Sequence, residues 1–282
     1  MERQGTLSVG GFTLTYRIEG EGTPLLVVGS ALYYSRLFAP ALRKKVQLVF
    51  IDHRGFGVAP ASYGPEDYRF ERVVDDIEEA RQQLGLGDVV IVGHSGHAFL
   101  ALEYARKYPE AARRVVLLNS APTNSPARQE QSVAYFVETA EPERKERFER
   151  DFALFQRDVQ RDPEHRFVHL LIRTRAQAFY DYHFDTAPLW EGVHPNMSII
   201  DYLWGNVFAS IDMKQHLLHF DRPVLLCLGR YDYLIGPVAL WDGIEAANKH
   251  VRKVIFERSG HNPMYEEPDR FEQTLLDWLH SS

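Results

Sequence analysis

Short apolar runs alternate with amphipathic stretches over both ends of the chain. Such runs cover residues 24–28, 46–51, 89–92, 115–118, 223–228 and 253–256. Residues 70–84 place Val73, Ile77 and Leu84 at helical spacing, and Gly85 follows as a stop signal. Continuous apolar runs are typical of strands buried on both faces, so the alternation predicts a mostly parallel sheet with helices on both faces.

Further elements complete this α/β pattern. Alternating residues over 7–18, interrupted by Gly10-Gly11, predict a hairpin. Helical patterns follow Ser95 as far as about Lys107 and cover residues 238–248 and 268–280.

The alternation of strands and helices stops between residues 122 and 213. This segment holds charged helical stretches and then aromatic-rich stretches. It is expected to form an inserted, mainly helical cap. The α/β core is then expected to combine residues 1–121 with residues 214–282.

Composition narrows the class of protein. Of 282 residues, 45% are hydrophobic and 25% charged, as is usual for a globular chain. The net charge of −7 gives no basic footprint for nucleic acid. The single cysteine, Cys227, rules out an intrachain disulfide, and no run approaches the ~18 apolar residues of a membrane span. We expect a cytoplasmic protein that acts on a small molecule, with no nucleic-acid or membrane partner; homo-oligomerisation stays open.

Three polar residues lie within a few positions after three predicted strands. Ser95 lies in Gly93-His94-Ser95-Gly96, between an apolar run and a helical pattern. Asp232 follows the run at 223–228, and His261 follows the run at 253–256. A sharp strand-to-helix turn exposes a serine hydroxyl as a nucleophile, and it needs a base and an orienting acid. Sites of parallel sheets form at the carboxyl ends of the strands, so these residues are expected to converge.

The chain resembles an α/β-hydrolase with a cap domain, in the proline iminopeptidase-like branch of serine hydrolases. Besides the three residues above, the resemblance rests on Asp52-His53-Arg54-Gly55-Phe56-Gly57, on Ala101-Leu102-Glu103-Tyr104-Ala105 and on Lys107-Tyr108-Pro109-Glu110. It implies a catalytic triad in which Ser95 attacks, His261 transfers the proton and Asp232 orients His261. Singly, the three could be a helix cap, a loop histidine and a turn former; their joint placement favours the triad.

One position departs from the usual nucleophile elbow, the sharp strand-to-helix turn that carries the serine. Such a turn has small residues two places before and after the nucleophile. Gly93 fits this pattern, whereas His97 does not. We expect either that His97 points into a neighbouring pocket, or that the elbow is built differently, with Gly96 taking the backbone strain. His97 is interpreted first as a packed, hydrogen-bonded side chain and second as a substrate contact.

An acyl-transfer site also needs backbone N–H donors for the oxyanion. The amide of Gly96 is the first candidate. The second is Ser30, in the loop after the strand at 24–28, with Ala31 as the neighbour if the register shifts. Val28 stands where related sequences usually have the histidine of a His-Gly pair, so this loop matches only loosely.

Substrate contacts are expected from His97, Tyr33, Tyr180 and Trp204, the last two in the cap. An iminopeptidase would also need carboxylates facing the nucleophile. The cap supplies Glu164, Asp181, Asp185, Glu191 and Asp201 as candidates. The chain has no His-Glu-x-x-His motif, no paired cysteines and no complete glycine-rich phosphate loop, so no metal or cofactor is predicted.

The sequence therefore predicts a serine hydrolase that cleaves a small ester or amide through an acyl-enzyme. Proline iminopeptidase activity is the first alternative. A non-hydrolytic binding protein on the same scaffold is the second, because fold does not fix function.

Overall fold

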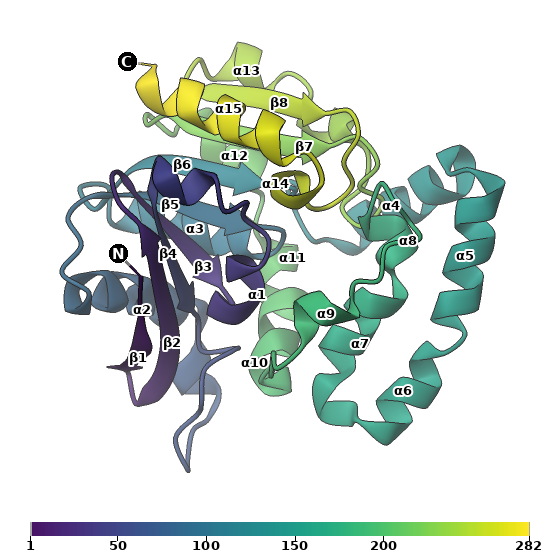
Figure 1. Cartoon of the computed structure of the whole chain (residues 1–282), viewed down its shortest axis with the longest axis horizontal. Helices are drawn as coiled ribbons and strands as arrows, with labels where there is room; N and C mark the ends of the chain where they lie inside the picture. The colour runs from purple at the N-terminus through teal and green to yellow at the C-terminus, as the bar shows by residue number, and fades with distance from the viewer. Residues whose placement is uncertain (1, 282) are drawn as a thin grey trace.

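A computed structural model of the chain describes residues 2–281, which form an eight-stranded sheet beside a helical cap (Figure 1). The strands are β1 (Arg3–Val9), β2 (Phe12–Gly20), β3 (Pro24–Gly29), β4 (Gln47–Asp52), β5 (Val89–His94), β6 (Ala112–Leu118), β7 (Val224–Gly229) and β8 (Val251–Phe256). Their order is β1-β2-β4-β3-β5-β6-β7-β8. β2 pairs antiparallel with β1 and β4, and the pairings from β4 to β8 are parallel. The predicted α/β-hydrolase architecture is confirmed.

The sheet is buried on both faces because successive side chains of a strand point to opposite sides. In β3, Leu26 and Val28 pack with helices α2 (Phe70–Gln83) and α3 (His97–Lys107). Leu25 and Val27 pack on the other face with α1 (Ala31–Ser35) and α15 (Pro268–His280). Each fully buried aliphatic side chain contributes about 1.5–3 kcal/mol. This double burial explains the uninterrupted apolar runs.

Two loops show where local sequence decides the backbone. Gly10 (φ 53°) and Gly11 (φ 84°) make the tight turn of the predicted hairpin, which is confirmed. The helix predicted over 238–248 is wrong: a 3₁₀ turn at Val238–Trp241 precedes Gly243, whose φ of 80° breaks the helix, and α13 covers only Ile244–Ala247.

Nine α-helices fill the chain between β6 and β7, over and just beyond the segment expected to be the cap. They are α4 (Pro126–Thr139), α5 (Pro142–Phe152), α6 (Phe155–Arg161), α7 (Arg166–Arg173), α8 (Arg175–Ala178), α9 (Ala187–Trp190), α10 (Met197–Tyr202), α11 (Phe208–Ser210) and α12 (Met213–Leu218). A π-helical turn covers Leu203–Val207, and 3₁₀ turns cover Leu42–Lys44, Pro65–Tyr68 and Pro163–His165. α14 (Pro263–Glu266) precedes α15. In Figure 1 the arrowheads of β6, β7 and β8 point toward the side where α4 to α9 lie.

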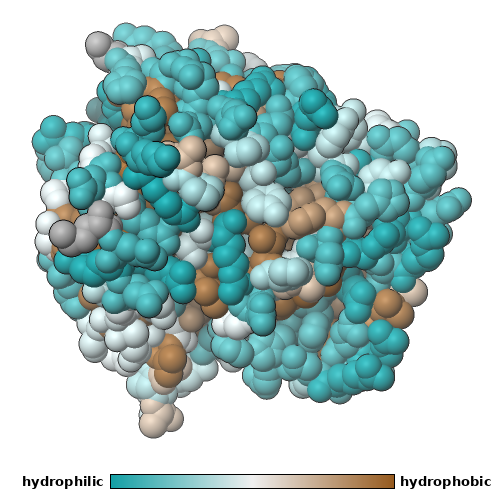
Figure 2. Space-filling model, viewed as in Figure 1, coloured by the Kyte–Doolittle hydropathy of each residue, from teal (hydrophilic) through white to brown (hydrophobic). Residues whose placement is uncertain are grey.

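The surface in Figure 2 is mostly hydrophilic, with brown hydrophobic residues gathered near the centre of this face, between the core and the cap. Within residues 2–281, no helix has both the length and the apolar character needed to cross a bilayer.

Candidate active site

The turn after β5 holds Ser95 in a strained conformation. β5 ends at His94, α3 begins at His97, and Ser95 between them has φ of 56°. A positive φ is uncommon for a residue with a side chain and marks functional turns. Gly96 has an ordinary φ of −59°, so the alternative in which Gly96 takes the strain is wrong.

The elbow leaves no room for a side chain at Gly93. A Cβ there would lie 2.6 Å from the Cα of Ala98 and against the carbonyl oxygen of His97. A Cβ on Gly96 would lie 2.6 Å from the indole of Trp204, a cap residue. The two glycines thus allow α3 and the cap to approach the nucleophile closely.

Gly93→Ala is therefore expected to destabilise the fold by about 1–3 kcal/mol, as overpacking does. Thermal unfolding measures the effect. Gly87→Ala is the matched control, because a Cβ on Gly87 meets no atom within 4 Å. Equal melting temperatures for the two variants would contradict the crowding at the elbow.

The predicted acid and base meet at the carboxyl edge of the sheet. His261 Nδ1 lies 2.6 Å from Asp232 Oδ2, and the residues are 6% and 0% exposed. The His261 amide also donates to the Ala178 carbonyl at 2.6 Å. With Nδ1 facing the carboxylate, Nε2 is left for proton transfer. His261 and Ser95 line one cavity, and the catalytic role of Ser95 with this His261–Asp232 pair stays a prediction.

Asn119 at the end of β6 is a site residue that sequence reasoning missed. Its Nδ2 donates to Asp232 Oδ2 and to the Gly260 carbonyl, each at 2.8 Å. Asp232 Oδ1 accepts the amides of Leu234 and Ile235 at 3.1 and 3.3 Å. The φ of 43° at Asn119 fits the tolerance of asparagine for this region. The sequence feature that could have identified Asn119 is its position directly after a buried strand.

Glu266 is a second residue that the sequence reasoning missed. Its Oε1 accepts the amides of Gly260 and Asn262 at 3.0 Å each, on both sides of His261, and its Oε2 accepts the Tyr180 amide at 2.6 Å. Burial raises the pKa of this carboxyl to about 7. Glu266 thus ties the His261 loop to the cap.

A chain of buried imidazoles continues from the elbow. His97 Nδ1 lies 2.8 Å from the hydroxyl of Tyr34, and its Nε2 lies 3.1 Å from His53 Nε2. Tyr34 also reaches His94 Nδ1 at 3.1 Å. His97 is therefore packed and hydrogen-bonded while it also lines the cavity.

The ends of this chain determine its tautomers. His53 Nδ1 accepts the Gly55 amide at 3.0 Å, so its Nε2 carries the proton. His94 Nε2 lies 2.7 Å from the His261 carbonyl and must donate to it. The hydrogen bonds of the chain therefore all have the same direction: His53 donates to His97, His97 donates to Tyr34, and Tyr34 donates to His94. All three imidazoles are neutral, and burial lowers the pKa of His53 to about 3 and those of His94 and His97 well below 6.5.

This neutrality predicts a pH dependence of stability. A folded-state pKa below the unfolded value gives stability that is present above pH ~6.5 and is lost as the pH falls below it. Denaturant unfolding between pH 7.5 and 5 measures this effect. The free energy of unfolding of the wild type is expected to exceed that of His97→Asn by a margin that shrinks by up to about 1.4 kcal/mol per pH unit as the pH falls. His219→Asn, at an exposed position, is the control. Parallel profiles for wild type and His97→Asn would contradict the neutral chain.

The expected oxyanion donors lie beside the nucleophile. Gly96 and Ser30 both line the cavity. The Ala31 amide donates to Asp52 Oδ1 at 2.8 Å, so this N–H already has an acceptor. The Ser30 amide is therefore favoured as the second oxyanion donor. The Ser30 hydroxyl accepts the Tyr33 amide at 3.3 Å and caps α1, so the side chain holds the loop.

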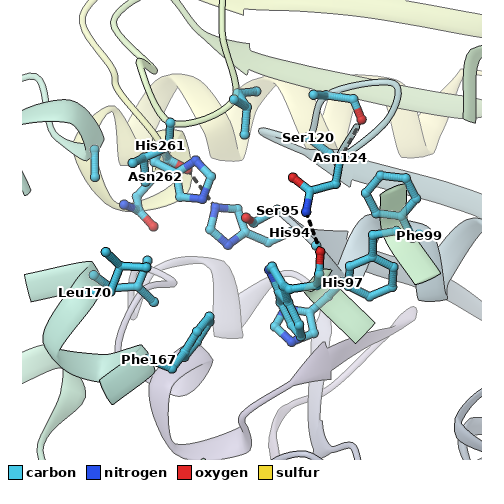
Figure 3. Close-up of a pocket in the computed structure, with 18 of the residues that line it drawn as sticks. His94, Ser95, His97, Phe99, Ser120, Asn124, Phe167, Leu170, His261 and Asn262 are labelled. Atoms are coloured by element: carbon cyan, nitrogen blue, oxygen red, sulfur yellow. Dashed lines mark hydrogen bonds between the residues drawn. The ribbon is translucent and has the colours of Figure 1, made fainter. Parts of the chain in front are cut away.

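The cavity has a volume of about 240 Å³ and a mainly apolar wall. In Figure 3, Ser95, His94 and His261 lie between a side formed by Phe167 and Leu170 and a side formed by Phe99 and Asn124. The other lining residues include Tyr33, Tyr34, Phe56, His97, Ser120, Thr123, Arg128, Phe179, Trp190, Trp204 and Asn262. No group of three or more metal-binding side chains suited to an ion occurs within residues 2–281.

Three of the four expected substrate contacts, His97, Tyr33 and Trp204, line this cavity. Tyr180 does not, and that expectation is corrected. Its side chain is 37% exposed and its ring packs 4.9 Å from that of Tyr231. Phe179 has extended backbone, so neighbouring side chains point to opposite sides, and Phe179 is the one that faces inward, at 5% exposed.

Comparison with known sequences gives a clear family match. A family model described as alpha/beta hydrolase fold matches residues 20–268. The chain is 54% identical over 279 residues to AB hydrolase superfamily protein YclE of Bacillus subtilis, covering 99% of both chains. It is 24% identical to a proline iminopeptidase of Heyndrickxia coagulans, covering 100% of both.

Comparison of structures agrees on the fold. An alpha/beta fold family hydrolase from Bacillus anthracis superposes with a TM-score of 0.73 over 99% of both chains, at 19% identity. The likeness therefore extends over the core and the cap together.

Proposed function

The chain belongs to the α/β hydrolase fold family, and on this premise we propose that it is a serine hydrolase that cleaves a small ester through a covalent acyl-enzyme. The observation that carries the proposal is the buried His261–Asp232 pair at the same cavity as the strained Ser95.

The proposed reaction has two balanced halves. Ser95 Oγ attacks the ester carbonyl carbon while His261 Nε2 takes the hydroxyl proton, and the same proton then leaves with the alcohol. Water attacks the acyl-serine, His261 takes a proton from it and returns it to Ser95 Oγ, and the carboxylic acid departs. The amides of Gly96 and Ser30 are the proposed donors to the oxyanion, each worth roughly 3 kcal/mol.

The lining of the cavity supports ester cleavage over iminopeptidase activity. An iminopeptidase must pair the charged amino terminus of its substrate with a carboxylate near the nucleophile. No Asp or Glu is among the described residues that line the cavity, and Glu164, Asp181, Asp185, Glu191 and Asp201 all lie outside that lining. A positively charged amine would be desolvated there without a partner.

A substrate panel tests the proposal. The wild type is expected to hydrolyse 4-nitrophenyl esters of short acids and to leave proline 4-nitroanilide intact. The reverse preference would support the iminopeptidase alternative. Failure to cleave any ester or anilide, together with no reaction with a fluorophosphonate, would favour a non-hydrolytic binding protein.

A further inference from the structure

One side of the cavity carries a permanent positive charge. Arg128 is the single arginine or lysine among the described residues that line the cavity, and it is 8% exposed. It lies in the first turn of α4, the helix that follows the pocket residues Thr123 and Asn124. A buried guanidinium is costly unless an anion compensates its charge.

The partners of Arg128 are all neutral. Its Nε donates to the Thr123 carbonyl at 3.2 Å, and its Nη1 donates to Ser132 Oγ at 3.0 Å and to the Leu234 carbonyl at 2.9 Å. Its Nη2 donates to Asn124 Oδ1. A guanidinium has five N–H groups, so these bonds fix its plane and leave one Nη2 hydrogen unassigned.

No carboxylate within residues 2–281 forms an ion pair with Arg128. Asp232 is close enough to raise the pKa of Arg128, but burial outweighs it and the pKa is lowered. The carboxylate of Asp232 already accepts four hydrogen bonds, from His261, Asn119 and two backbone amides. The charge of Arg128 is thus left without a dedicated counter-ion.

The amino-terminal end of α4 adds to the positive electrostatic potential on this side of the cavity. Ser125 caps this 14-residue helix, and its first turn contains no acidic residue. The amino end of a helix carries a partial positive charge that favours anions. A buried guanidinium and an uncompensated helix start therefore act on the same side of the cavity.

We propose that Arg128 binds a carboxylate on the substrate, so that the ester cleaved at Ser95 bears an anionic group at its far end. The proposal rests on the proposed serine hydrolase function and names its substrate class. One guanidinium with one unassigned N–H matches a monovalent carboxylate, whereas a phosphate dianion would need more donors than this wall offers. The remaining apolar lining suits a short hydrocarbon spacer.

Matched pairs of esters test the proposal on each side of the scissile bond. The acyl-side pair is mono(4-nitrophenyl) glutarate and its terminal amide; the alcohol-side pair is 4-acetoxybenzoate and 4-acetoxybenzamide. The wild type is expected to prefer the carboxylate of at least one pair by about 10-fold or more in kcat/KM, mainly through KM, equivalent to about 1.4 kcal/mol. No preference in either pair would overturn the proposal.

Variants separate recognition from architecture. Arg128→Gln is expected to abolish the preference by lowering kcat/KM for the carboxylate substrate about 10-fold more than for its neutral partner, and Arg128→Lys is expected to recover part of the preference. Arg113→Gln, at an exposed ion pair with Asp88, is the matched control. An equal loss on both members of a pair would mean that Arg128 only supports the fold.

A measurement on the wild type keeps the proposal testable if Arg128→Gln fails to fold. Calorimetric titration is expected to detect binding of glutarate or of benzoate, weakened by added salt. It is expected to detect no binding of the neutral amides, glutaramide and benzamide. Equal binding of acid and amide, or of neither, overturns the proposal.

If the wild type hydrolyses neutral esters as fast as anionic ones, the serine hydrolase function stands and only the anion site fails. If it hydrolyses none, the proposed function fails, and calorimetry still decides on Arg128.

Discussion

Ser95→Ala is expected to lower kcat/KM for ester hydrolysis by about 10⁴-fold or more, because no other hydroxyl takes the place of the strained serine at the elbow. The substitution removes one oxygen from a partly exposed side chain, so the melting temperature is expected to stay close to that of the wild type. Steady-state hydrolysis of a 4-nitrophenyl ester measures the loss.

Ser210→Ala is the matched control for this variant. Ser210 is exposed, and its hydroxyl donates only to the Val207 carbonyl at 2.8 Å. The control is expected to keep wild-type activity. Substantial hydrolysis by Ser95→Ala would place the nucleophile elsewhere and contradict the account.

Asp232→Asn is expected to reduce kcat by roughly 10³-fold to 10⁴-fold, because an amide cannot hold His261 as the carboxylate does. The carboxylate accepts hydrogen bonds on both oxygens, and asparagine would turn an NH₂ group toward the donors of Leu234 and Ile235 or toward His261 and Asn119. The same clash predicts some loss of stability.

Activity and thermal unfolding together separate these two effects. Asp221→Asn, at an exposed position before β7, is the control and is expected to behave as wild type. A variant at position 232 that loses stability but keeps kcat would show that this carboxylate supports the loop and not the catalysis.

The strands and the three site residues could be predicted because their signals are local. An apolar run that ends at a polar residue marks the carboxyl end of a strand, and parallel strands bring such ends to one edge. The helix expected over 238–248 failed for a local reason as well, since the sequence pattern did not weigh the left-handed backbone that Gly243 adopts.

Other parts of the site depend on tertiary contacts that no local pattern encodes. The bond from Asn119 to Asp232 spans 113 positions, and the bond from His94 to the His261 carbonyl spans 167. The choice between Phe179 and Tyr180 depends on which side of an extended segment faces the core. Arg128 has the sequence appearance of an exposed helical residue, and it becomes notable only because α4 packs it against the core at Leu234.

Covalent labelling tests the central claim most directly. Wild-type protein treated with a fluorophosphonate and digested is expected to carry one adduct, on the peptide that contains Ser95, with reduced labelling in His261→Gln and none in Ser95→Ala. An adduct on another residue, or an unlabelled wild type that nonetheless hydrolyses esters, would contradict the proposal that Ser95 is the nucleophile.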